Sequence, residues 1–115
     1  MSLPAYAIGY LREVRFGEEI ATYMQRIDAT LAPFGGHFLV HGGALSPLEG
    51  EWDGDIIIIA FPDRDSALAW YGSADYQELV PLRTSNSEGI VTVVDGVQPG
   101  HRATDKLAEV RAATP

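Results

Sequence analysis

The sequence predicts an α+β domain made of two successive strand–helix–strand halves. Four segments with strand-like apolar patterns mark the strands, and helical spacing of apolar residues marks the segments that cross over between them. An Asp53-Gly54 pair between two apolar runs is typical of a hairpin, which would join the two halves. The resulting order, βαββαβ, predicts a ferredoxin-like fold with a four-stranded antiparallel sheet.

The first half is expected to hold a strand, a helix and a second strand. Residues 5–11 alternate in the manner of a strand, with Tyr6, Ile8 and Tyr10 on one face and smaller residues on the other. A helix is predicted next, because apolar residues recur at helical spacing, and we interpret this apolar stripe as core packing. Its members are Phe16, Ile20, Tyr23, Met24, Ile27 and Leu31. Residues 36–41 are the predicted second strand, which residues 44–48 can continue after a bend.

The second half is expected to contain a strand, two short helices, a polar loop and a last strand. Their predicted ranges, in chain order, are 56–61, 64–71, 74–79, 84–87 and 89–94. Asp63 and Ser73 are the expected N-caps of the two helices, because a short polar side chain can accept a hydrogen bond from a free helical N–H. Pro81 is expected to stop the second helix.

The third and fourth strands point beyond a single chain. A sheet with helices on one face only should alternate apolar and polar residues, whereas residues 56–61 are continuously apolar and residues 90–94 barely alternate. We therefore expect a second copy to cover the free face, so that two sheets form a dimeric α+β barrel. The alternative cover is the C-terminal tail, whose low hydrophobicity argues against it.

The 115 residues fit one domain, which we place at residues 1–97. Residues 98–115 form a tail in which Thr104 could cap a short helix carrying Leu107 and Val110.

The net charge of −8, with eight scattered basic residues, disfavours nucleic acid and anionic membranes as partners. The absence of cysteine and of a recognisable signal peptide fits a cytoplasmic protein.

Three stretches carry a resemblance to a known family. They are residues 31–43 (LAPFGGHFLVHGG), residues 48–52 (LEGEW) before a strand ending in Phe61-Pro62, and the set Ala69-Trp70-Tyr71, Ser73, Tyr76 and Pro81-Leu82-Arg83. Together they resemble the domain of unknown function 1330 family from about residue 5 to residue 97. The resemblance implies a dimeric α+β barrel with a pocket in each subunit and no known reaction. Similar barrels include cofactor-free monooxygenases, lactone isomerases and haem-degrading enzymes.

His37 and His41 are the candidate acid–base residues. They lie four apart on a predicted strand and should face the same way, with Cα atoms roughly 13 Å apart. That separation is too great for joint ligation of one metal ion, so no metal site is expected, and each could act singly as a general base. The family resemblance implies arginine at both positions, so histidine here makes the charge titratable. The alternative interpretation is two polar surface residues.

Arg83 is the strongest candidate for binding a ligand, with Tyr76 and Trp52 as aromatic residues beside predicted loops. A lone arginine in an acidic protein can hold a carboxylate or enolate through two parallel hydrogen bonds. The alternative for Arg83 is a salt bridge to one of the sixteen acidic residues. The alternative for the two aromatic residues is core or interface packing.

Two hypotheses about function follow, because standard catalytic and nucleotide-binding motifs are absent. The first is a cofactor-independent acid/base enzyme acting on a small organic acid or ketone. The second is a non-catalytic homodimer that binds a ligand or serves a structural role. A weaker third is haem binding through one histidine as axial ligand. We expect no cofactor.

Overall fold

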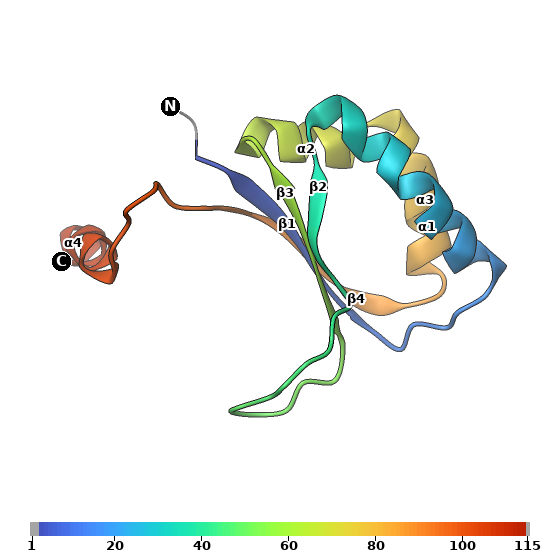
Figure 1. The fold of residues 1–115 in the computed structure, drawn as a ribbon, viewed down its shortest axis with the longest axis horizontal. Coiled ribbons are helices and arrows are strands. Elements are labelled where there is room, and N and C mark those ends of the chain that lie inside the picture. The colour runs from blue at the N-terminus through green and yellow to red at the C-terminus, as the bar shows by residue number, and fades with distance from the viewer. Residues whose placement is uncertain (1–2, 115) are drawn as a thin grey trace.

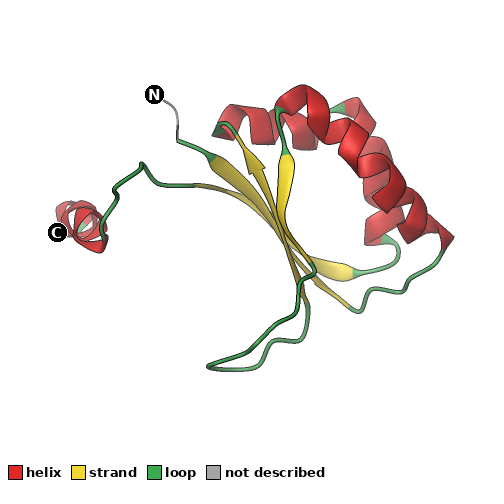
Figure 2. Cartoon of the chain, viewed as in Figure 1, coloured by secondary structure: helices red, strands yellow, loops and turns green. Residues whose placement is uncertain are grey.

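Four antiparallel strands form one sheet, with the order β2-β3-β1-β4, in the computed structural model, which describes residues 3–114. The elements in chain order are β1 (Ala5–Arg12), α1 (Glu18–Leu31), a 3₁₀ turn (Ala32–Phe34), β2 (His37–His41), β3 (Asp55–Phe61), α2 (Arg64–Gly72), α3 (Ala74–Thr84), β4 (Glu88–Asp95) and α4 (Ala103–Ala113). This arrangement confirms the predicted α+β class and the ferredoxin-like order (Figures 1 and 2).

Helices α1, α2 and α3 all lie on one face of the sheet (Figure 1). Strands β1, β3 and β4 direct their odd-numbered side chains toward these helices, and Ala5 and Ala7 of β1 are buried beneath them. The core between the layers is made by Ala5, Ala7, Ile27, Leu31, Ile59, Phe61, Ala67, Trp70, Tyr76 and Leu79.

The opposite face of the sheet, here called the outer face, carries no helix (Figure 2). The strand register places on it Tyr6, Ile8, Tyr10, Ile56, Ile58, Ala60, Ile90, Thr92 and Val94. Ile90 is 72% exposed. The continuous apolar run of β3 is therefore explained by the two faces of the sheet, of which this chain covers one.

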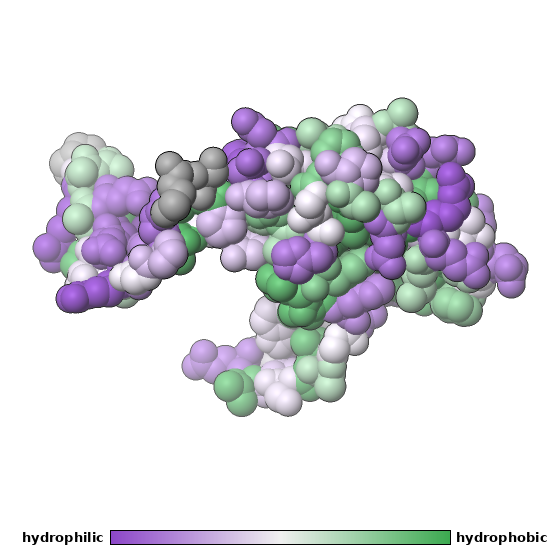
Figure 3. Space-filling view, turned by 45° about the horizontal axis from the view of Figure 1, so that its top comes forward, coloured by the Kyte–Doolittle hydropathy of each residue, from purple (hydrophilic) through white to green (hydrophobic). Residues whose placement is uncertain are grey.

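The tail does not cover the outer face in this chain. Helix α4 begins after Arg102 rather than at a Thr104 cap, because the Asp105 carboxylate accepts a hydrogen bond from the Arg102 N–H at 3.0 Å. All described residues from 98 onward are exposed, and the space-filling view shows α4 standing apart from the body of the domain (Figure 3).

The expected short hairpin at Asp53-Gly54 is wrong. The whole connection from residue 42 to residue 54 has neither helix nor strand, so the expected continuation of β2 over 44–48 is also absent. Asp53 instead pairs with Tyr10, whose hydroxyl donates to the carboxylate and accepts from the Asp53 N–H at 3.0 Å. Gly54 is needed for a close approach, since a Cβ there would lie 2.5 Å from the Leu11 carbonyl oxygen.

Helix α3 does not stop before Pro81 but continues to Thr84, which shortens the predicted polar loop to residues 85–87. A proline inside a helix removes one hydrogen bond. The packing of Leu79, Val80 and Leu82 against the core compensates for that loss. As a result Arg83 belongs to the last turn of a helix and faces inward rather than lying in a loop.

A bulge in β2 overturns the expectation that His37 and His41 face the same way. His37 pairs with Ala60 and His41 pairs with Ile57, but the register shifts between Phe38 and Val40, which leaves Leu39 as the extra residue. One extra residue reverses the alternation. His37 therefore lies on the outer face, and His41 lies on the helix-covered face.

Candidate functional site

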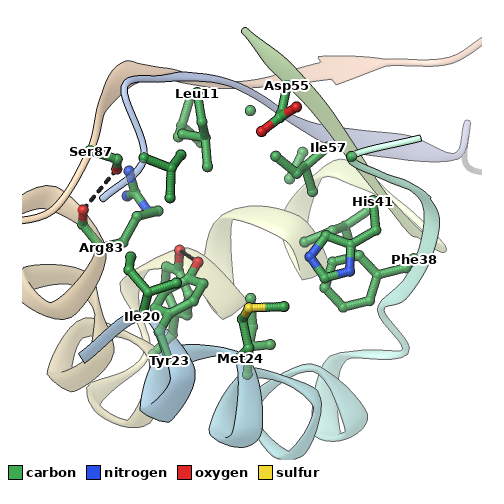
Figure 4. A pocket seen from close by; sticks show the side chains of 18 of the residues that line it. Leu11, Ile20, Tyr23, Met24, Phe38, His41, Asp55, Ile57, Arg83 and Ser87 are labelled. Carbon is green, nitrogen blue, oxygen red and sulfur yellow. Dashed lines mark hydrogen bonds between the residues drawn. The ribbon is translucent and has the colours of Figure 1, made fainter. Parts of the chain in front are cut away.

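A cavity of about 270 Å³ lies between the sheet and the helices (Figure 4). Its walls are largely apolar and come from the middle of β1 and β3, from α1, and from α2 and α3. Representative lining residues are Ala7, Gly9, Ile57, Ile27 and Trp70. The small residues Ala7 and Gly9 of β1 leave part of the space that the cavity occupies.

Arg83 lines this cavity and is only 8% exposed. Within residues 3–114, no carboxylate lies within 4.0 Å of its guanidinium nitrogens, and its buried Nε has no hydrogen-bond partner. Arg83 therefore forms no internal salt bridge within the described residues. The backbone carbonyl of Arg83 accepts from the Ser87 hydroxyl at 2.8 Å, which ties the end of α3 to the start of β4.

Two phenols stand beside the guanidinium. The hydroxyl groups of Tyr23, from α1, and Tyr76, from α3, share a hydrogen bond of 2.7 Å, and their rings meet edge to face. Burial raises the pKa of Tyr23, and the adjacent Tyr76 raises it further. Burial lowers the pKa of Arg83, but the phenol oxygens of Tyr76 and Tyr23 outweigh this effect and the net pKa is raised.

This end of the cavity has more donors than acceptors. A guanidinium brings five N–H donors and no acceptor, and each phenol brings one O–H. The bond between Tyr23 and Tyr76 uses one of those protons. The remaining donors include the N–H at Arg83 Nε, which has no hydrogen-bond partner among the described residues. A ligand group that only accepts hydrogen bonds, such as a carboxylate or an enolate oxygen, matches this end.

His41 lies with Phe38 at the other end of the cavity from Arg83 (Figure 4). Its ring stacks on that of Phe38, with centroids 4.5 Å apart and planes 15° apart. Asp55, from the start of β3, lines the same exposed part of the cavity. An imidazole and a carboxylate thus line the cavity at the end away from the guanidinium.

The structure does not bring the other two candidates to this cavity. His37 is on the outer face because of the β2 bulge. Trp52 lies in the connection between β2 and β3, where its ring contacts the outer-face residue Tyr10 edge to face at 5.9 Å. Within residues 3–114, no three histidine, cysteine or acidic side chains gather as a metal site would require.

Two residues of the site were missed by sequence reasoning. Tyr23 belongs to the predicted core stripe, and Asp55 directly precedes the predicted third strand. A signal for Tyr23 does exist, because a tyrosine in a core stripe carries a hydroxyl that needs a partner when buried. Asp55 has no comparable signal, since its role depends on the length of the connection that precedes it.

The fold and this cavity define a ferredoxin-like domain with an internal pocket between its sheet and its helices. The chain belongs to the family of domain of unknown function 1330, whose model matches residues 4–97. The match leaves the tail outside. No curated protein matches the chain, and no helix within residues 3–114 is both long and apolar enough to cross a membrane.

Solved structures share the fold at low sequence identity. A protein of unknown function from Rhodopseudomonas palustris is 17% identical, with 86% of each chain covered and a TM-score of 0.60. SnoaB, a cofactor-independent oxygenase from Streptomyces nogalater, is 14% identical, with 88% of this chain and all of that chain covered and a TM-score of 0.57. A dimeric ferredoxin-like protein of unknown function from Jannaschia sp. is 14% identical, with coverage of 83% and 99% and a TM-score of 0.54.

Proposed function

We propose that the cavity binds a small organic anion, a carboxylate or an enolate, through Arg83. The observation that carries this proposal is a guanidinium that is buried without a carboxylate partner among the described residues. Arginine is almost never fully buried unless it is paired, because taking a charge out of water costs several kcal/mol. An anion that enters the cavity would supply the missing partner.

The form of the cavity supports a ligand that is otherwise apolar. Apart from Arg83, the two phenols and Ser87, the interior is formed mainly by aliphatic and aromatic side chains. Pockets for drug-sized ligands run from about 300 to 1,000 Å³. A volume of about 270 Å³ is below that range, so the ligand is a small acid or ketone rather than a nucleotide or a peptide.

The same arrangement supports a cofactor-independent acid/base enzyme. Arg83 would hold the carboxylate of a keto acid, and His41, at the other end of the cavity, would take a proton from the carbon next to the ketone and return it to the enolate that forms. The alternative is a protein that binds the same ligand without changing it. Proton exchange separates the two: incubation of a bound keto acid in D₂O should introduce deuterium next to the carbonyl for the enzyme, and none in a His41→Gln variant.

A homodimer is the second part of the proposal. The outer face exposes a continuous apolar surface that includes Ile90 and Val94, and a second copy with the same face would cover it. The bound dimer would form the α+β barrel in which each subunit keeps its own cavity on the helix-covered side. His37 and Trp52 would then belong to the subunit interface or its edge.

A matched pair of ligands tests the anion site directly. Calorimetric titration should show binding of butanoate and hexanoate, and much weaker binding of the uncharged amides of the same length. The amides keep the shape and lose the charge. Equal affinity for acid and amide, or binding of neither, would contradict the anion site.

A further inference from the structure

Exposed apolar side chains line part of the cavity. Of the large apolar residues that are exposed, four line the cavity, and they are Val14, Phe16, Met24 and Val91. Phe16 is 76% exposed and Met24 is 46% exposed. Scattered exposed apolar residues are ordinary. Here the four exposed apolar residues line one cavity, and the buried end of that cavity carries the guanidinium of Arg83.

We infer that the ligand is an amphipathic monocarboxylate whose apolar end leaves the cavity between Val14, Phe16 and Met24, and that these three residues set the length of chain the protein prefers. The inference rests on the proposed function, because the carboxylate is held by Arg83. It goes further by assigning the class of ligand and the residues that determine the preferred chain length. We call Val14, Phe16 and Met24 the apolar rim.

The apolar rim is held in place rather than left as a free loop. Arg15 lies between Val14 and Phe16, and its N–H donates to the Asn86 carbonyl at 2.8 Å. The Arg15 guanidinium also donates to the Ser85 carbonyl at 3.1 Å and to the Glu13 carbonyl at 3.3 Å. Arg15 thus fastens this segment to the turn that follows Arg83.

Both ends of the binding path are therefore built on the same support. Asn86 also donates from its side chain to the Leu82 carbonyl at 2.9 Å and to the Glu19 carboxylate at 2.9 Å, which ties the end of α3 to the start of α1. The distance between the cation and the apolar rim is consequently set by backbone-anchored contacts. A fixed distance between a charged head site and an apolar exit is what a chain-length preference requires.

The small volume of the cavity explains why the rim is needed. At roughly 30 Å³ for a group the size of water, a cavity of about 270 Å³ has room for a carboxylate of about seven carbons, so a longer chain must continue past the mouth. There it would cover Phe16 and Met24, which water otherwise surrounds. Each additional buried methylene is worth about a fourfold gain in affinity. For chains that reach the rim, part of that gain comes from rim contacts.

Straight-chain carboxylates from acetate to octanoate, titrated by calorimetry, test the inference. In the wild type, affinity should rise about fourfold per methylene and continue to rise through octanoate. For the shortest acids that bind the wild type, Phe16→Ser should show the same affinity as the wild type. For octanoate, its affinity should be up to tenfold lower. Because Phe16 is exposed, the substitution removes no core contact. Leu48→Ser, at a residue 93% exposed and outside the cavity, is the matched control and should follow wild type.

Several results would overturn the inference, and they are distinguishable from failure of the proposed function. If the affinity of the wild type stops rising before hexanoate, the rim does not contact the chain, although the carboxylate still binds. The same conclusion follows if wild type and Phe16→Ser have the same affinities for every acid. A change in dimer mass for Phe16→Ser, measured by light scattering, would make the rim a subunit contact instead. Absence of binding by every acid would contradict the anion site itself and the rim with it.

Discussion

The hydroxyl groups of Tyr23 and Tyr76 bond to each other at 2.7 Å beside the guanidinium of Arg83. The two phenols come from different helices, so their bond joins α1 to α3 across the cavity. Burial and the adjacent Tyr76 raise the pKa of Tyr23, which favours its neutral form. The arrangement combines a permanent positive charge with donors that carry none, which suits an oxyanion that appears only when ligand is present.

The first prediction concerns pH and Tyr23. Burial and the adjacent Tyr76 raise the pKa of Tyr23 in the folded protein above the ordinary value near 10. The folded state therefore favours the neutral phenol, and the stability this contributes is complete below about pH 10 and is lost as the pH rises through the raised pKa. Tyr23→Phe should cost about 0.5–1.5 kcal/mol at pH 8 through the lost hydrogen bond.

Urea denaturation of both proteins at several pH values from 8 to 11 checks this prediction. The difference in unfolding free energy between wild type and Tyr23→Phe should shrink above pH 10, because Tyr23 then ionises in the unfolded wild-type chain while the folded phenol stays neutral, which favours unfolding of the wild type alone. Tyr71→Phe is the control, since no side-chain hydrogen bond of Tyr71 is recorded in the described chain. A difference that stays constant to pH 11 would contradict the assignment.

The second prediction concerns the space in front of β1. A Cβ added at Gly9 would meet only the Ile57 Cβ, at an ordinary 3.8 Å, and its backbone is not in the left-handed region. Gly9→Val should therefore fold and fill part of the cavity, with thermal stability unchanged or raised because a branched residue suits a strand. Affinity for butanoate and hexanoate should fall at least tenfold. Unchanged affinity would place the ligand elsewhere.

Much of this architecture could be predicted from the sequence, because strand alternation and helical spacing are local patterns. The faces of β1, with Tyr6 and Ile8 opposite Ala7, are one example. The sequence also indicates Arg83 and His41 as candidate site residues, and both line the cavity.

What could not be predicted depends on contacts between distant segments. The bulge at Leu39 has no sequence signature, and it separates His37 from His41 by reversing one step of alternation. Tyr23 looks like any other member of a core stripe until α3 brings Tyr76 within 2.7 Å. Pro81 predicts a helix end from local chemistry, and tertiary packing overrides it.

The third prediction concerns the outer face. Ile90 lies on edge strand β4 and is largely exposed, so Ile90→Asp should leave the fold of one chain intact. If two outer faces pack together, a buried, unpaired carboxylate at that position should convert dimer to monomer. Light scattering at micromolar concentration measures the mass. Leu68→Asp, at an exposed position on α2, is the control and should leave the mass unchanged. A monomeric wild type would contradict the barrel.

The last prediction separates the two roles of Arg83, because binding and stability should change in opposite directions. Without ligand, the buried guanidinium has no carboxylate partner in the described chain, so Arg83→Met removes the desolvation penalty of a buried charge and keeps most of the volume. Replacing buried ionic groups with apolar ones is neutral or stabilising by up to ~1–4 kcal/mol. The thermal midpoint of free Arg83→Met should therefore equal or exceed that of wild type.

Carboxylate binding should be lost in the same variant, by at least the ~1.5–3 kcal/mol of a hydrogen bond to a charged group. Arg83→Lys should recover only part of it, since an ammonium cannot make two parallel hydrogen bonds to one carboxylate. Arg64→Met is the control: Arg64 is half exposed and paired with Asp95 at 3.4 Å, outside the main cavity, and should alter neither quantity by more than ~1 kcal/mol. A free Arg83→Met protein markedly less stable than wild type would mean that the guanidinium is a structural partner of Tyr23 and Tyr76 rather than a site awaiting an anion.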